Sequence, residues 1–256
     1  MKPEPNTRYM FLFAHPDDDV FICGTMRALI EAEADLTGVW LTSGGFLGGS
    51  EARETELAAA MEVLGLGREG IRLLRLPDLG LVSGLEGYAD TLAQVMSETR
   101  PDVIFVTAFE GGHPDHDAAN FMAFEASARI GIKPRIFEFP LYNGSGPRRH
   151  WRWRINRFPD DGVPVFHTPL PGDVLRRKYC IMRKYSSQWM YMIPARLACR
   201  RIGEPGTGEP YRLCPPDRDH TVRPHVGTLN YERWFNAFMK IRFSDFQAAV
   251  QKVRKS

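Results

Sequence analysis

The sequence predicts an α/β fold in which helices cover both faces of a mostly parallel, Rossmann-like sheet. Over the first 140 residues, short apolar runs alternate with segments of helical periodicity. The apolar runs hold few polar residues, as strands buried on both faces do. Alternation of such strands with helices is typical of parallel sheets. After residue 140 this pattern ends, and a C-terminal extension of a hairpin and helices is expected.

The predicted core has five strands and four helices. The strands are expected at residues 8–14, 36–41, 71–76, 103–108 and 135–139. The helices are expected at residues 24–34, 50–64, 85–99 and 118–130. Ser50 is predicted to cap the second helix and Gly65 to end it. Asp115 and Asp117 are predicted to cap the fourth helix, with hydrogen bonds to its backbone or to a histidine ring.

The C-terminal part gives weaker signals. Residues 151–155 alternate with period two, and a turn separates them from an apolar run at 163–166, which predicts a hairpin or a pair of edge strands. A helix capped by Asp173 is expected over 174–185. Residues 203–227 are expected to form a long loop. Two short helices are expected near 231–239 and 245–253.

The composition is that of an ordinary soluble protein. The chain has 256 residues, of which 43% are hydrophobic and 25% charged, and its formal net charge is only +2. Four cysteines occur without a CxxC pair, which argues against a zinc knuckle or a disulfide framework. No signal peptide or membrane-spanning run is seen, so a cytoplasmic location is expected.

A basic segment lies between Arg148 and Arg157 and includes two tryptophans. It could contact nucleic acid or an anionic substrate. An edge strand with one charged, exposed face explains it more simply. We therefore expect no nucleic-acid partner.

The chemistry is concentrated in two loops that follow predicted strands. The first loop reads His15-Pro16-Asp17-Asp18-Asp19, and the second reads His113-Pro114-Asp115-His116-Asp117. In doubly wound sheets, ligands bind beyond the carboxyl ends of the strands where the strand order reverses. If strands 8–14 and 103–108 are neighbours at that point, the two loops face each other.

His15, Asp18 and His116 then form a set of two histidines and one carboxylate. Three protein ligands with an open position are typical of a catalytic zinc site. Fe²⁺ or another divalent ion would suit the same donors. Adjacent residues in a tight loop point in different directions, so Asp17 is expected to act as a general base rather than as a second ligand.

The motifs Ala14-His15-Pro16-Asp17-Asp18 and His113-Pro114-Asp115-His116 resemble the two signature motifs of the PIG-L/LmbE-like zinc-dependent N-deacetylases. Weaker similarities extend over most of the chain. They are Gly24-Thr25, Leu41-Thr42-Ser43-Gly44, Arg53 with Glu56, and Lys178 with Tyr185-Ser186-Ser187-Gln188.

The resemblance implies that the whole chain, 1–256, is one LmbE-like domain, with an α/β core at 1–140 and a part at 141–256 that shapes the substrate mouth. It implies zinc held by His15, Asp18 and His116, with Asp17 taking a proton from the metal-bound water. His113 would stabilise the oxyanion or assist the departing amine. Contacts to sugar hydroxyls are implied for Arg53 and Asp78.

Two departures from the family pattern stand out. Asp19 occupies a position where the family usually has glutamate, and we assign it, with Asp115, to support around the metal ligands. Glycines precede His113 where some members have a tyrosine, so an aromatic contribution there must come from another part of the chain.

The function expected from these observations is removal of an N-acetyl or other N-acyl group from an amino sugar or glycoconjugate. Two alternatives stay open: an amidase that acts on a non-sugar metabolite, and a sugar- or nucleotide-binding α/β module without turnover. The sequence leaves the sugar, the acyl length and lipid linkage undetermined. A homo-oligomer is compatible with it.

Overall fold

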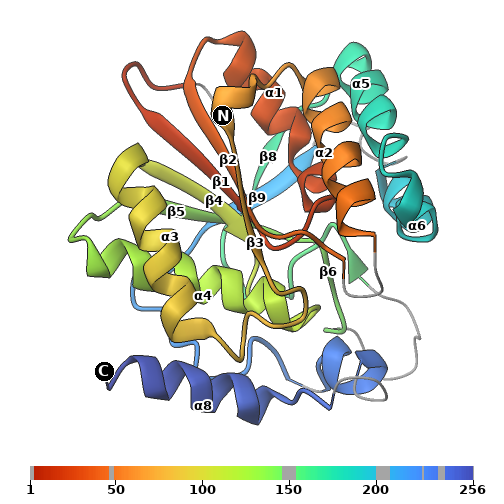
Figure 1. Ribbon diagram of the computed structural model, residues 1–256. Helices are drawn as coiled ribbons and strands as arrows, with labels where there is room; N and C mark the ends of the chain where they lie inside the picture. Colours follow the sequence, from red (N-terminus) through yellow and green to blue (C-terminus); the bar gives the residue numbers. More distant parts are fainter. Residues whose placement is uncertain are drawn as a thin grey trace.

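The computed structural model is built around a seven-stranded sheet with the strand order β3-β2-β1-β4-β5-β9-β8 (Figure 1). The structure describes residues 3–45, 49–145, 154–199, 208–226, 228–235 and 240–255. The strands of this sheet are β1 (Arg8–Phe13), β2 (Asp35–Thr42), β3 (Ile71–Leu76), β4 (Val103–Thr107), β5 (Arg135–Phe139), β8 (Phe166–Thr168) and β9 (Glu209–Leu213).

Five strands run parallel, and β1 occupies the position where the strand order reverses. It pairs with β2 on one side and with β4 on the other. Strands β9 and β8 continue the sheet in antiparallel orientation. This confirms the predicted α/β fold and the neighbouring positions of β1 and β4.

Helices cover both faces of the sheet, as predicted (Figure 1). The α-helices are α1 (Cys23–Glu31), α2 (Ser50–Leu64), α3 (Leu85–Thr99), α4 (Pro114–Arg129), α5 (Gly172–Met182), α6 (Trp189–Cys199) and α8 (Phe243–Val253). Short helical turns are η1 (Asp18–Phe21), η2 (Arg68–Gly70), η3 (Ser186–Gln188) and η4 (Tyr231–Phe235).

Strand β1 shows how the two faces divide. Phe11 and Phe13 lie in the core formed with α1, α2 and α5, whereas Met10 and Leu12 lie in the core formed with α3, α4 and α8. Successive side chains of a strand point to opposite faces, so one strand contributes to both cores. All four side chains are completely buried.

Two helix N-caps differ from the prediction. Ser50 is the first residue of α2, and the N-cap position belongs to Gly49, whose φ of 90° is in the left-handed region. The predicted C-cap Gly65 is confirmed. Helix α4 begins at Pro114, four residues before the predicted start, because Pro suits the first helical turn and His113 caps it.

Of the two alternatives predicted for residues 151–166, the hairpin is wrong, whereas two edge strands are found, since β7 (Arg154–Ile155) and β8 each lie at the edge of a sheet. Residues 154–155 form β7, which pairs with β6 (Tyr142–Asn143), whereas β8 pairs with β9. Residues 151–153 lie outside the described part of the chain. Strand β9 arises within the segment predicted to be a loop, since strand pairing with β5 and β8 outweighs its Pro-containing composition. Helix α6 was not predicted either.

The other C-terminal helices agree better with expectation. Helix α5 begins at Gly172 and ends three residues earlier than predicted, and Asp173 lies in its first turn without capping it. Helix α8 covers the last predicted helix. Residues 236–239 of the preceding one lie outside the described ranges. In the described part of the chain, no helix combines the length and apolarity needed to cross a bilayer.

A buried ion pair joins the C-terminal part to the first helix. Lys178 Nζ lies 2.6 Å from Glu209 Oε1, and both side chains are fully buried. The Glu209 carboxylate also accepts hydrogen bonds from the backbone N–H groups of Gly24 and Thr25. Glu209 therefore serves the first turn of α1, which has no side-chain cap from its own sequence.

We expect Lys178→Ala to lower the free energy of unfolding by about 3–5 kcal/mol, because it leaves the buried Glu209 carboxylate without its cation. Urea unfolding monitored by circular dichroism measures this loss. Lys252→Ala is the matched control, since Lys252 is 77% exposed and pairs with Glu86 at the surface. Its expected cost is about 0–1 kcal/mol. Equal losses in the two variants would contradict the importance of the buried pair.

Candidate active site

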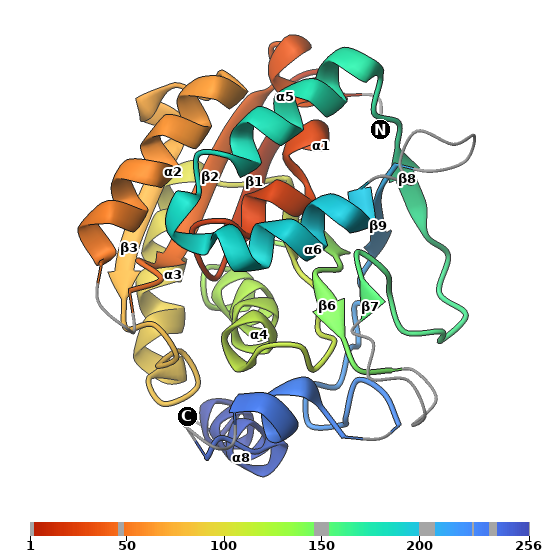
Figure 2. The ribbon, with the colours of Figure 1, turned by 90° about the vertical axis from the view of Figure 1, so that its right-hand side faces the viewer.

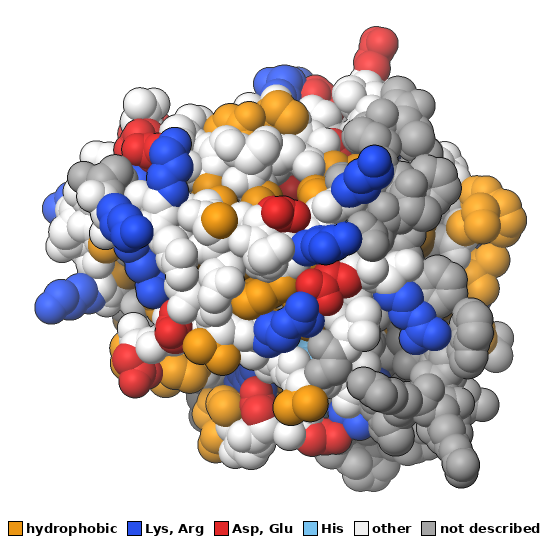
Figure 3. Space-filling view, turned by 90° about the horizontal axis from the view of Figure 1, so that it is seen from below, with side chains coloured by type: hydrophobic (Ala, Val, Ile, Leu, Met, Phe, Trp, Pro, Cys, Tyr) orange, Lys and Arg blue, Asp and Glu red, His pale blue; other side chains and the backbone are white. Residues whose placement is uncertain are grey.

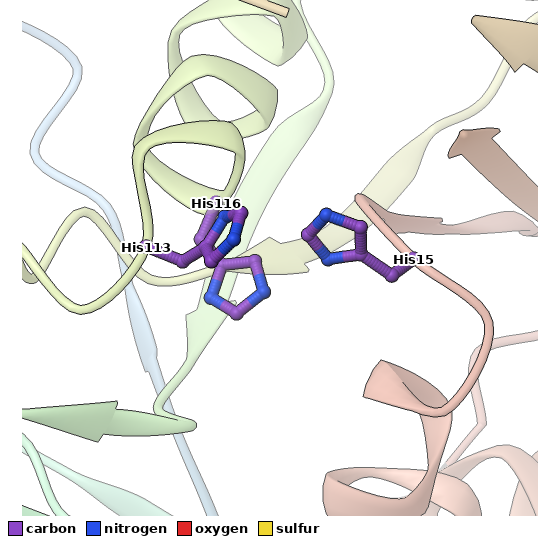
Figure 4. A group of neighbouring side chains, drawn as sticks. All are labelled: His15, His113 and His116. Carbon is purple, nitrogen blue, oxygen red and sulfur yellow. The ribbon is translucent and has the colours of Figure 1, made fainter. Parts of the chain in front are cut away.

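The loops that follow β1 and β4 bring three histidines together. His15 reaches from the first loop toward His113 and His116, which lie at the beginning of α4 (Figure 4). One ring nitrogen from each histidine lies within 4.8 Å of the others, and all three side chains are buried. The predicted meeting of the two loops is therefore confirmed.

Asp18 lies between two of these histidines. Its Oδ1 is 3.1 Å from Nε2 of His116, and its Oδ2 is 3.7 Å from Nδ1 of His15. Oδ2 also accepts the backbone N–H of His15 at 2.8 Å, which closes the loop on itself. The three residues predicted to hold a metal are thus in direct contact.

Charges in this cluster determine which groups are ionised. Burial opposes ionisation of Asp18, but the His116 and His15 rings beside it lower the pKa of its carboxyl below the ordinary value. Burial, together with the neighbouring rings of His15 and His116, holds the pKa of His113 well below 6.5. Burial opposes protonation of His15, but hydrogen bonds to Asp115, Asp18 and Asp78 raise its pKa well above 6.5, so a metal ion would have to displace its proton.

The orientation of the His15 ring is set by two carboxylates on its far side. Nε2 lies 3.1 Å from Asp78 Oδ1 and 3.3 Å from Asp115 Oδ2. Nε2 thus faces Asp78 and Asp115, whereas Nδ1 faces Asp18. Asp115 contacts a histidine ring as predicted, but its other bonds come from the N–H groups of Leu79 and Leu81 rather than from α4.

Asp117 does not cap α4 either. Its Oδ1 accepts the backbone N–H groups of Glu110 and Gly111, at 3.1 Å each, and so fixes the loop that leads to His113. The prediction was wrong because His113 itself is the cap: its Nδ1 accepts the N–H of Asp115 at 3.2 Å.

Asp17 has an unusual backbone and a cationic neighbour. Its φ of 98° is in the left-handed region, which is uncommon for a residue with a side chain and is found at functional sites. Its Oδ1 accepts a hydrogen bond from Arg53 Nη2 at 3.1 Å. Burial raises the pKa of the Asp17 carboxyl, although the Arg53 charge opposes this shift.

Arg53 lies beside the predicted base and is only 4% exposed. Nη2 also donates to the backbone oxygen of Pro16. Nε and Nη1 are buried and have no hydrogen-bond partner among the residues that the structure describes. These two N–H-bearing nitrogens could therefore donate to a bound ligand.

Asp19 is held by a tyrosine from the C-terminal part. Tyr185 Oη donates to Asp19 Oδ1 at 2.5 Å, and both side chains are completely buried. Oδ1 also accepts the backbone N–H of Asp17 at 3.2 Å. Burial raises the pKa of Asp19 to about 6, while the Tyr185 hydroxyl opposes the shift. Tyr185 and Asp19 together support the strained backbone of Asp17.

Tyr142 supplies an aromatic side chain next to the histidines. Its ring packs edge-on against His116, with 5.6 Å between centroids. Gly112 permits this approach, because a Cβ at that position would lie 2.0 Å from the backbone oxygen of Tyr142. The glycine that replaces the tyrosine of some relatives thus makes room for one from β6.

Sequence reasoning missed the site contributions of Tyr142, Tyr185 and Glu209. Tyr185 belongs to a segment whose similarity to the family was noticed, so that segment was the available signal. Tyr142 lies in β6, which has only two residues, and Glu209 lies in β9, which was not predicted. No local sequence pattern marks either residue as part of the site.

The donor set fits a divalent metal ion. A carboxylate lies between two imidazoles, and a third imidazole is within reach. A second group, formed by His15, Asp78 and Asp115, has a comparable spacing. Asp115 in that group already accepts two backbone N–H groups, which favours the set around Asp18 as the metal-binding one.

Comparison with known proteins agrees with the site geometry. Residues 10–127, which include both loops, match the family profile described as PIG-L: GlcNAc-PI de-N-acetylase. This span is similar to a PIG-L domain. Tyr142, Tyr185 and Glu209 lie beyond the matched residues, so the C-terminal part adds side chains to the candidate site.

A curated relative is similar over much of the chain. It is the 1D-myo-inositol 2-acetamido-2-deoxy-alpha-D-glucopyranoside deacetylase of Thermobispora bispora, 30% identical over 210 residues. The match covers 69% of this chain, and the chain spans 63% of the length of that relative.

Solved structures share the fold of the PIG-L domain and its extension. The A40926 pseudoaglycone deacetylase is 17% identical with a TM-score of 0.63, covering 83% of this chain and 99% of its own. The N,N'-diacetylchitobiose deacetylase of Pyrococcus horikoshii is 21% identical with a TM-score of 0.59, covering 82% and 84%.

Tyr185→Phe tests the support of the Asp17 loop. We expect it to lower the free energy of unfolding by about 1–3 kcal/mol, because the buried Asp19 carboxylate loses a donor. Tyr9→Phe is the control, since Tyr9 is also buried but its Oη bonds to Glu4 near the N-terminus. Its expected cost is about 1 kcal/mol or less. Urea unfolding distinguishes the two, and a larger loss in Tyr9→Phe would refute the assignment.

Proposed function

We propose that this chain is a metal-dependent hydrolase that removes an N-acetyl group from an amino sugar or a glycoconjugate. The observation that carries the proposal is the position of Asp18 between His15 and His116, with the Asp17 carboxylate on the adjacent residue. A binding module would need no second carboxylate beside such a donor set. Hydrolysis of an amide does, because a proton must be removed from the attacking water.

His15, Asp18 and His116 would hold the ion, and we propose Zn²⁺, with Fe²⁺ as the alternative for the same donors. A divalent ion at this position would lower the pKa of a water and polarise the amide carbonyl of the substrate. The buried carboxylates around His15 orient its ring for this role. Asp115 and Asp78 thereby act through His15 rather than on the ion.

Asp17 is the proposed general base. Its carboxylate pairs with Arg53, whereas that of Asp18 contacts His15 and His116, so the two carboxylates would serve different purposes. Arg53 holds one Asp17 oxygen, which leaves the other available to accept a proton from water. Tyr185 and Asp19 fix the backbone N–H of Asp17 and so keep this geometry.

His113 is the proposed oxyanion donor. Because its Nδ1 accepts the backbone N–H of Asp115, the neutral ring carries its proton on Nε2. An Nε2–H group can donate to an oxygen that becomes negative in the tetrahedral state. The proton that Asp17 takes from the attacking water would then pass from its carboxylic acid to the departing amine.

An N-acetylated sugar is supported as the substrate class by two of the relatives. The Thermobispora bispora protein is named for a 2-acetamido-2-deoxyglucopyranoside, and the Pyrococcus horikoshii protein for diacetylchitobiose. We propose that Nε and Nη1 of Arg53, together with Asp78, contact the hydroxyl groups of such a sugar.

Asp17→Asn and His116→Ala separate the base from the ligands. We expect Asp17→Asn to keep its bound metal but to lose about 10²–10⁴-fold in kcat, because an amide cannot accept the proton. His116→Ala should lose metal as well as activity. Metal analysis of the purified protein and amine release from N-acetylglucosamine conjugates measure the two effects.

Asp102→Asn is the control, since Asp102 is an exposed carboxylate that pairs with Arg8 at the surface. It should retain both metal and activity. Full hydrolysis by Asp17→Asn protein would overturn the role of Asp17. A wild-type protein that takes up no metal at neutral pH would overturn the proposed function.

Arg53→Lys tests the substrate contact. A lysine can still pair with Asp17 but lacks the remaining guanidinium N–H groups, so we expect KM to rise about tenfold or more, as for one lost charged hydrogen bond. Arg75→Lys is the matched control, because Arg75 is a surface arginine paired with Glu54. An unchanged KM in Arg53→Lys would contradict the substrate contact and leave Arg53 only its ion pair with Asp17.

A further inference from the structure

Helix α6 exposes an apolar surface that its own fold does not cover. Five of its large apolar side chains are each more than half exposed, and Met190 reaches 66%. They are Trp189, Met190, Tyr191, Ile193 and Leu197. Single exposed apolar residues are normal, but five within nine positions form a contiguous patch of the kind that marks an interaction site.

Helix α6 is apolar on its buried side and on its exposed side. Met192 and Ala195 face the protein and are buried, so the protein side of α6 is already satisfied. Trp189, Ile193 and Leu197 follow one another at intervals of four residues and therefore share a face of the helix. A helix of a soluble protein normally carries polar residues on such an outward face.

Figure 2 shows α6 on the side of the molecule that faces the viewer, next to α5, β6 and β7. An apolar cluster also protrudes at the right-hand edge of Figure 3, the side on which α6 lies in Figure 1. The apolar patch is thus on the outer surface of the molecule and projects from it.

The sequence around α6 is strongly basic. Residues 174–203 contain eight Lys and Arg residues and no Asp or Glu, although the whole chain has a formal net charge of only +2. Within the described part of this segment, five of the cations are exposed. They are Arg176, Arg177, Arg183, Lys184 and Arg196. The positive charge of the chain is therefore concentrated around the exposed apolar helix.

We propose that α6 docks this protein on an anionic membrane surface. An outward face with Trp, Tyr, Ile and Leu, flanked by Lys and Arg, is the composition of helices that lie in the interface of a bilayer. Tryptophan and tyrosine suit the headgroup level, and the basic residues attract anionic lipids. With 11 residues the helix is about 16 Å long, too short to span a bilayer but sufficient to lie on one.

Charge argues against a second copy of this chain as the occupant. A twofold interface places the same patch of both subunits together, which would oppose two basic segments without acidic partners. Nucleic acid would use the cations but would leave Ile193 and Leu197 without a role. An anionic membrane satisfies both the apolar and the basic side chains.

The docking surface lies beside the candidate active site. Helix α6 contacts β7, which pairs with β6, and the Tyr142 ring of β6 contacts His116. A membrane bound at α6 would therefore lie near the candidate site. This docking does not depend on the proposed hydrolase function, because it can be measured without a substrate.

The test is sedimentation of the full chain with vesicles. We expect binding to vesicles of equal parts phosphatidylcholine and phosphatidylglycerol, weaker binding to phosphatidylcholine alone, and loss of binding in high salt. Trp189→Ser with Ile193→Ser should lower the partition coefficient about tenfold or more. Arg176→Gln with Arg177→Gln should lower it about fivefold per charge removed, since each cation near the surface contributes about that factor.

The control is Leu213→Ser with Val222→Ser, which removes exposed apolar side chains outside α6. It should bind like the wild type, and circular dichroism should show the same helix content in all variants. Absence of binding to the anionic vesicles would overturn the proposal. Undiminished binding by the Trp189→Ser, Ile193→Ser variant would also overturn it. A wild-type dimer that is absent in this variant would instead identify α6 as a dimer interface and overturn the proposal too. Vesicle binding by a wild-type protein that shows no hydrolysis would contradict the proposed function but not the membrane docking.

Discussion

The parallel pairing of β1 with β4 is the constraint on which the site depends. The register aligns Tyr9 with Val103 and Leu12 with Val106, so both strands end at the same edge of the sheet. Neighbouring strands are about 4.8 Å apart, which is a distance that His15 and His116 can bridge with Asp18 between them. If another strand lay between β1 and β4, the two loops could not bring His15, Asp18 and His116 together.

The residues that complete the site come from the other half of the chain. Tyr185 holds Asp19 from the end of α5, Glu209 serves the first turn of α1 from β9, and Tyr142 packs against His116 from β6. None of them is in the span matched by the family profile. The N-terminal half thus provides the reactive groups, and the C-terminal half determines how rigidly they are held.

Local pattern was sufficient for the parallel core, because each buried strand is a short apolar run and each helix has its own periodicity. Strands β3 and β5 and helix α3 have the predicted bounds. The strands β6 and β9 could not be predicted, since the two residues of β6 carry no period and β9 forms only through its neighbours. Strand β7 lies at the end of the run 151–155 that was predicted to be a strand. The two loops were found from His and Asp alone. The hydrogen bonds of Arg53 to Asp17 and of Tyr185 to Asp19 could be found only from the tertiary structure, because 36 and 166 residues separate the partners.

The bond from Glu209 to the first turn of α1 has a consequence for the order of folding. Its partners Gly24 and Thr25 lie 185 and 184 residues earlier in the chain. Contacts between such distant segments form late, because the intervening chain must first be ordered. During synthesis, the loop with His15 and Asp18 emerges early, but the first turn of α1 gains its hydrogen bonds to Glu209 only after β9 has been made. We therefore expect the capacity to bind a metal tightly to arise only when the last strand of the sheet is in place.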